Sequence, residues 1–238
     1  MIRSTLIALG AVFLVTYNSS PSLGSAENTI TADSVVSSAE VPMTSGTTSL
    51  SVNLAPSAQV DQIAIADVLS YSGSKPTITA PDGWQLIRDD YSLTTRQSLY
   101  WHRVEANDPT TASWTFSEPV DAQGAILLLD NVASDSPVDK TSGKTGSVPT
   151  LTANPIANAA AGDLILVFYA TNFEGVGLTP TMPDNVDTLL NYEAPREYWI
   201  LATYQSQNGS TGDAACPTPQ WFYWIAAQVA IKRSAATL

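Results

Sequence analysis

The sequence predicts an all-β fold of the β-sandwich or jelly-roll kind, and three observations point to it. From residue 47 onward, short stretches alternate between apolar and polar residues, which is the period of a half-buried strand. Turns rich in Gly, Pro, Asn and Asp separate these stretches. Outside the N-terminal segment, no window longer than about ten residues keeps a helical period. Many short strands at such spacing are typical of sandwiches and barrels.

The composition narrows the class of protein further. Of the 238 residues, 44% are apolar and only 13% are charged, which is too apolar for a disordered acidic chain. Lys and Arg number 10 against 22 Asp and Glu, giving a net charge of −12. Because such a chain repels a polyanion, a nucleic-acid-binding function is not the leading interpretation.

The N-terminal segment has the pattern of a secretory signal peptide. A basic start at residues 1–3 precedes an apolar run over 6–15, and small residues lead to a cleavage site after Ala26. The apolar run is shorter than the roughly 20 residues that span a bilayer. We expect residues 1–26 to be a signal peptide. The alternative is a retained hydrophobic arm that touches a membrane or a neighbouring subunit through residues 6–17.

Residues 27–46 are rich in Ser, Thr, Val and Ala without a clear period, so they predict an extended arm or linker. Such an arm can add a strand to the open sheet edge of a second subunit, where backbone hydrogen bonds provide the affinity. We therefore expect self-association into a homo-oligomer or filament through residues 27–46.

The strands of the body begin where alternation begins. In the first half they are expected over residues 47–54, 62–69, 84–88, 97–104, 112–116 and 122–129. Several later segments are apolar at both parities, above all residues 164–169 and 221–227. Strands of that kind are covered on two faces, so we expect the two halves of the body to pack together.

The second half of the body repeats the first. Residues 62–66 correspond to 163–167, and residues 125–129 correspond to 227–231, each about 100 residues further on. The interpretation is one sandwich over residues 47–233, built from pseudo-repeated antiparallel units at 47–132 and 148–233. A turn-rich segment over residues 131–147 joins them.

Several strings in the chain carry a family resemblance. They are TITAPDGWQLI, LYWHRVEANDP, ASWTFSEPVDAQGAILLLDNV, DSPVDK and GDLILVFYATN, in this order. Together they resemble a widespread family of all-β domains of secreted bacterial surface proteins and phage virion or tail-associated proteins. The resemblance implies a β-sandwich exported to a surface or built into a particle, and it supplies no catalytic residues.

Reactive side chains are few. His102 is the only histidine, no GxSxG motif is present, and a polar cross-strand partner is its expected role. Cys216 is the only cysteine, so an intramolecular disulfide cannot form. We expect Cys216 to be partly buried at a strand edge, with an intermolecular disulfide as the alternative. One His and one Cys cannot supply a zinc site.

Carboxylates are the remaining chemistry. We expect no cofactor, although calcium stays open because it takes 6 to 8 oxygen ligands from carboxylates and loop carbonyls. The candidate calcium ligands are Asp89, Asp90, Asp130, Asp135 and Asp139. A glycoside hydrolase with paired carboxylates is a weaker alternative, and it would draw on Glu105, Glu118 or Glu197.

The aromatic run over residues 221–224 gives the candidate contact site. If Ile225 faces the core, then Phe222 and Trp224 point the other way. They either lie beneath the other repeat or form an exposed patch for a subunit or a sugar ring.

These observations favour a secreted, non-enzymatic structural or adhesive subunit. Its setting would be an extracellular or cell-surface assembly, such as a filament or surface layer, or a virion. The alternative is a carbohydrate-binding module that contacts a surface glycan through Phe222 and Trp224.

Overall fold

The computed structural model describes residues 35–172, 187–194, 197–205, 211, 214–217 and 223–234. These residues form strands throughout and contain no helix, so the predicted all-β class is confirmed. Since the described ranges hold no helix, they also hold no helical segment fit to span a membrane. The strands are β1 (Val35–Asn53), β2 (Ile63–Tyr71), β3 (Ile78–Thr79), β4 (Gln85–Ser92), β5 (Thr95–Arg103), β6 (Thr111–Leu129), β7 (Val138–Gly146), β8 (Thr150–Ala153), β9 (Leu164–Asn172), β10 (Asp187–Ala194), β11 (Glu197–Gln205), β12 (Ala214–Pro217) and β13 (Tyr223–Ile231).

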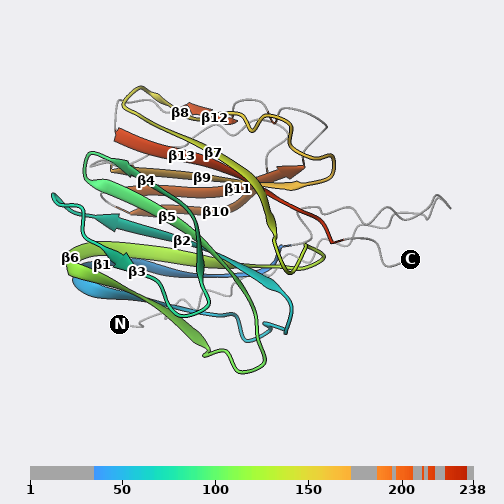
Figure 1. Ribbon diagram of the computed structural model, residues 1–238. Coiled ribbons are helices and arrows are strands. Elements are labelled where there is room, and N and C mark those ends of the chain that lie inside the picture. The colour runs from blue at the N-terminus through green and yellow to red at the C-terminus, as the bar shows by residue number, and fades with distance from the viewer. Residues whose placement is uncertain are drawn as a thin grey trace, which may run out of the picture.

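The strands form two main antiparallel sheets, stacked as shown in Figure 1. The first sheet has the order β1-β6-β2-β5-β4, with β3 paired to β6, and the second has the order β7-β13-β9-β11-β10. Strands β8 and β12 form a separate two-stranded sheet. The two main sheets have corresponding strand orders. In each sheet the first strand in sequence lies at the edge and pairs with the last one, β1 with β6 and β7 with β13.

Apolar side chains fill the layer between the two main sheets. Alternate residues of β2, β5 and β6 meet alternate residues of β9 and β13 there, and burying each large one stabilises the fold by roughly 1.5 to 3 kcal/mol. The layer consists of Ile63, Ile65, Leu99, Leu127, Leu129, Val132, Leu164, Leu166, Phe168, Ala227, Val229 and Ile231.

The outer face of each main sheet is covered as well. Strands β1 and β6 are long, and their outer halves fold beneath the first sheet around Leu50, Trp114 and Phe116. Strands β8 and β12 cover the second sheet, where Leu151 and Cys216 pack on β9 and β13. Strand β2 is buried along its whole length for this reason.

Two segments differ from the sequence prediction. Residues 35–46, expected within an extended arm, form the first half of β1 and pair with the last residues of β6. Residues 138–146, expected in a turn-rich connection, form β7 and pair with β13. Both lie at sheet edges, where small polar side chains face solvent and strict alternation is not required. Residues 1–26 and 27–34 lie outside the described residues.

Strand β6 also differs, because the two strands expected over 112–116 and 122–129 are one continuous strand of 19 residues. The intervening Glu118 and Pro119 are exposed and do not interrupt it. A proline is tolerated at this place because the register of β1 against β6 shifts next to it, between Thr47 and Ser49.

Candidate functional site

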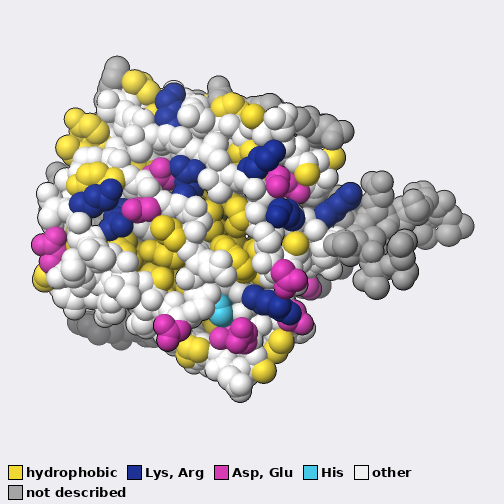
Figure 2. All heavy atoms as spheres, in the orientation of Figure 1, with side chains coloured by type: hydrophobic (Ala, Val, Ile, Leu, Met, Phe, Trp, Pro, Cys, Tyr) yellow, Lys and Arg dark blue, Asp and Glu magenta, His cyan; other side chains and the backbone are white. Residues whose placement is uncertain are grey.

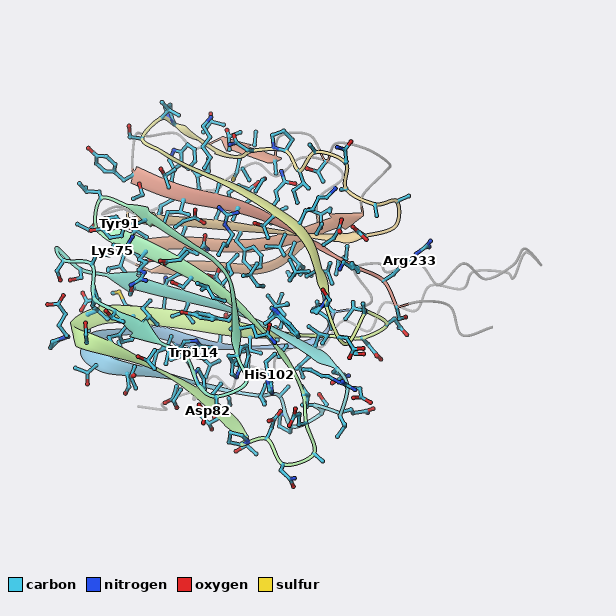
Figure 3. All side chains as sticks on the ribbon, viewed as in Figure 1. Lys75, Asp82, Tyr91, His102, Trp114 and Arg233 are labelled. Atoms are coloured by element: carbon cyan, nitrogen blue, oxygen red, sulfur yellow. The ribbon has the colours of Figure 1, made fainter. Side chains whose placement is uncertain are left out.

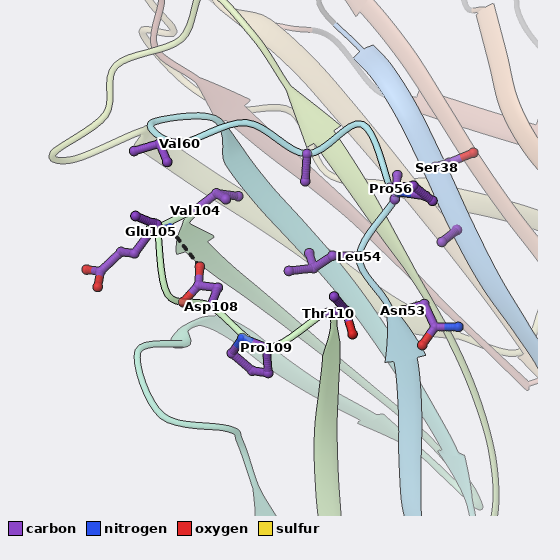
Figure 4. Close-up of a pocket in the computed structure, with 14 residues that line it drawn as sticks. Ser38, Asn53, Leu54, Pro56, Val60, Val104, Glu105, Asp108, Pro109 and Thr110 are labelled. Carbon is purple, nitrogen blue, oxygen red and sulfur yellow. Dashed lines mark hydrogen bonds between the residues drawn. The ribbon is translucent and has the colours of Figure 1, made fainter.

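A groove of about 610 Å³ opens beside β1, at one end of the first sheet. Ser38, from the first half of β1, lines one side, and Asn53, at the end of β1, lines another. The β1–β2 and β5–β6 loops complete the walls, as Figure 4 shows. Strand β1 folds back around the apolar cluster that contains Leu50, Trp114 and Phe116. No described strand pairs with the edge of β1 that faces away from β6, so the groove stays open there.

The groove has apolar walls and an acidic rim. Leu54, Val104 and Pro109 line it, together with Val60, which is 54% exposed. Glu105 and Asp108 supply the carboxylates. The Asp108 carboxylate accepts a hydrogen bond from the Glu105 backbone N–H at 2.7 Å, drawn as a dashed line in Figure 4, and this bond fixes the β5–β6 loop.

His102 lies in an adjoining pocket of about 450 Å³ that shares Leu54, Glu105, Asp108 and Pro109 with the groove. Its Nε2 is 2.6 Å from the Asp108 carboxylate, and its Nδ1 is 3.1 Å from the Gly83 carbonyl oxygen. The imidazole also stacks on Trp84, with ring centroids 5.3 Å apart. Figure 3 shows His102 in the lower part of the first sheet, to the right of Trp114 and Asp82, whereas Lys75 and Tyr91 lie at the upper left.

This geometry assigns His102 a bridging role. Both ring nitrogens face oxygen acceptors, so the imidazolium, with two N–H donors, satisfies both, whereas a neutral ring satisfies one. His102 therefore links the turn at Gly83 to the β5–β6 loop at Asp108. Its partners come from loops, whereas the sequence suggested a neighbouring strand.

Three of the five aspartates considered as calcium ligands pair with arginines, whereas Asp130 accepts from the Asn131 backbone N–H and no ion pair involves Asp139 among the described residues. Asp89 accepts from Arg96 at 2.7 Å, and Asp90 accepts from Arg88 at 2.5 Å. Burial raises the pKa of Asp89, but hydrogen bonds from Arg96 and Ser98 outweigh that effect and lower it. Asp135 lies 3.2 Å from Arg103. Within the part of the chain that the structure describes, no three His, Cys, Asp or Glu side chains gather as metal ligands.

The candidate hydrolase acids are not brought together. Glu105 lines the groove, Glu118 accepts a hydrogen bond from Ser74, and the Glu197 side chain lies outside the described residues.

Of the candidate contact residues, Trp224 is buried and Phe222 lies outside the described residues. The Trp224 ring packs against β8, β9 and β12, and its Nε1–H donates to the Val148 carbonyl at 3.0 Å. Its side chain does point away from Ile225, as the parity predicted, but the β8–β12 sheet covers it. Trp224 therefore offers no open ring face to a sugar, whereas the neighbouring Tyr223 is 46% exposed.

Cys216 is fully buried in β12, deeper than the partly buried position expected from the sequence. Burial raises the pKa of its thiol to about 12. A buried, protonated thiol is unreactive towards a second chain.

The sheet edges differ in how they are protected. Strand β4 carries Arg88, Asp89 and Asp90, and the Arg88 guanidinium donates to Thr141 of β7 at 3.1 Å, so these two edges join each other. Strand β1, at the other side of the first sheet, is 19 residues long, and Glu40 is its only charged residue. Figure 2 shows the acidic and basic side chains distributed over the face around His102.

The groove and the long edge of β1 were not found by sequence reasoning. The groove is formed mainly by turns, such as residues 53–58 and 105–110, whose Asn, Asp and Pro indicate a change of direction and no more. Comparison with protein-family models, curated proteins and solved structures finds no match to this chain.

Proposed function

We propose that this protein is a secreted, non-enzymatic structural or adhesive subunit of an extracellular or cell-surface assembly, or of a virion. The observation that carries the proposal is the edge of β1 with which no described strand pairs, a long row of backbone donors and acceptors with almost no charge. Natural proteins protect such edges with charged side chains or cover them, because open edges pair with other chains.

The body is proposed to be a β-sandwich of two pseudo-repeated units. The common strand order of the two main sheets supports this, since β1, β6, β2, β5 and β4 take the places of β7, β13, β9, β11 and β10. Strand β1 pairs with β6, and β7 pairs with β13. These pairings extend the two proposed units back to residues 35 and 138, ahead of the boundaries at 47 and 148 that the sequence suggested. A doubled, deeply packed body without disulfides suits a load-bearing subunit.

Export and the absence of catalysis belong to the same proposal. The basic and apolar start of the chain favours secretion, and the resemblance to surface and virion domains points the same way. Against an enzyme stands His102, because both of its ring nitrogens are engaged by Asp108 and Gly83.

Self-association of the purified full chain tests this function. Sedimentation velocity and negative-stain electron microscopy, over a wide range of chain concentrations, are expected to show dimers or larger assemblies that grow with concentration. A chain that stays monomeric at the highest concentration would contradict the proposal.

A further inference from the structure

We propose that two copies of the chain join through the edges of β1 with which no described strand pairs, antiparallel and in full overlap. This inference rests on the self-association proposed above, and it names the surface and the partner. In this register Val35 of one copy faces the partner's Asn53, and Glu40 faces the partner's Thr48. The contact is isologous, so each copy supplies the same strand.

The distribution of charge selects a second copy as the occupant. Each chain carries a net charge of −12, so two copies repel each other over most of their surfaces. Along β1, however, Glu40 is the only charged residue of 19. In full overlap each Glu40 faces the partner's Thr48, so the one charged residue of this strand meets an uncharged residue. No two like charges lie directly opposite each other in the ladder, so the contact avoids the repulsion that such pairs cause.

The edges at β4 and β7 do not offer this contact. Strand β7 carries Asp139, Lys140 and Lys144, and Arg88 of β4 reaches across to it. A second chain approaching there would meet charged side chains and an edge already bridged. The long side chains of β1 are few, and its exposed residues are mostly Ser and Thr, which pair well across strands.

The irregular centre of β1 shapes the expected ladder. Pro42 has no N–H, and the register of β1 against β6 shifts between Val41 and Thr47. Between two copies, the hydrogen bonds are therefore expected in two symmetrical runs, each joining residues 35–41 of one copy to residues 47–53 of the other. The groove beside Ser38 and Asn53 lies at the border of this contact.

Paired cysteines test the register. In the double variant Glu40→Cys with Thr48→Cys, mild oxidation is expected to give a covalent dimer, because opposite residues of an antiparallel pair lie within disulfide reach. Each single variant is the matched control, since its two thiols do not face each other in this register. The buried Cys216 does not contribute to the background. Equal cross-linking in the single variants, or none in the double variant of an associating chain, would overturn the inference.

Charged substitutions of Thr48 test the same contact without a cross-linking reaction. Thr48→Glu places a carboxylate opposite the partner's Glu40 at two symmetrical places, and Thr48→Lys places an ammonium there. Because Thr48 is exposed, both variants are expected to fold like the wild type. We expect a Kd about two- to thirtyfold higher for Thr48→Glu and lower by a similar factor for Thr48→Lys.

The outcomes separate this inference from the proposed function. If the wild type associates and both Thr48 variants associate equally well, self-association stands but β1 is not the contact. If the wild type stays monomeric, this inference and the proposed function both fail. Protection of the β1 amides in that monomer would then show that the edge is covered within one chain.

Discussion

Replacing Asp163 by Asn is expected to stabilise the protein at neutral pH. Asp163 follows Gly162 at the entry to β9 and is 2% exposed, and its Oδ2 has no hydrogen-bond partner among the described residues. Burial, followed by repulsion from Asp139, raises the pKa of Asp163 to about 6, although Lys232 and Arg233 act in the other direction.

The size of the effect follows from the difference in pKa between the folded and unfolded chain. A carboxyl whose pKa rises from 3.8 to about 6 on folding is neutral in both states only well below pH 3.8. As the pH rises from there to about 6, the unfolded chain loses its proton first, so the folded state is weakened by up to about 3 kcal/mol. The Asn side chain has a similar shape and cannot ionise. The stability gain of Asp163→Asn over the wild type should therefore be below about 1 kcal/mol at pH 4 and grow to about 3 kcal/mol at pH 7.

Urea unfolding at four pH values between 4 and 7, followed by tryptophan fluorescence, measures this difference. Asp82→Asn is the control, because Asp82 is an exposed acidic residue. The control should leave the pH dependence of the wild type unchanged. If Asp163→Asn keeps the wild-type slope between pH 4 and 7, the burial argument for Asp163 is refuted.

Three further substitutions test the packing and the loop bridge. Gly146→Ala should destabilise the fold by about 1 to 3 kcal/mol in urea unfolding, because a Cβ there would collide with the Trp224 ring; unchanged stability would mean that the ring moves freely. Trp224→Ala should cost about 3 to 5 kcal/mol, whereas an exposed sugar platform would cost almost nothing. Asp108→Asn should lower stability by about 1 to 3 kcal/mol and speed hydrogen exchange of the Glu105 amide. An exchange rate equal to that of the wild type would mean that Asp108 does not order the β5–β6 loop.

The buried centre of the fold could be predicted from the sequence because its strands carry their own signal. Residues 164–169 are apolar at both parities, and β9 is accordingly covered on both faces. The opposite orientations of Trp224 and Ile225 also followed from the two-residue period.

The edges and the site could not be predicted in the same way. The first half of β1 and all of β7 consist mainly of small and polar residues, and their strand conformation comes from pairing with β6 and β13. The burial of Trp224 depends on β8, which lies far away in the sequence, and on β12, which pairs with β8; no local pattern reports the contact with β8. The bridge from His102 to Asp108 and Gly83 likewise joins two turns whose residues indicate only a change of direction.

Hydrogen exchange measured on peptides from β1 is the most direct test of assembly through this edge. Exchange of residues 35–53 in dilute and concentrated samples of the full chain should slow as the concentration rises, while residues 85–92 of β4 keep one rate. Rates in β1 that are independent of concentration would contradict the account.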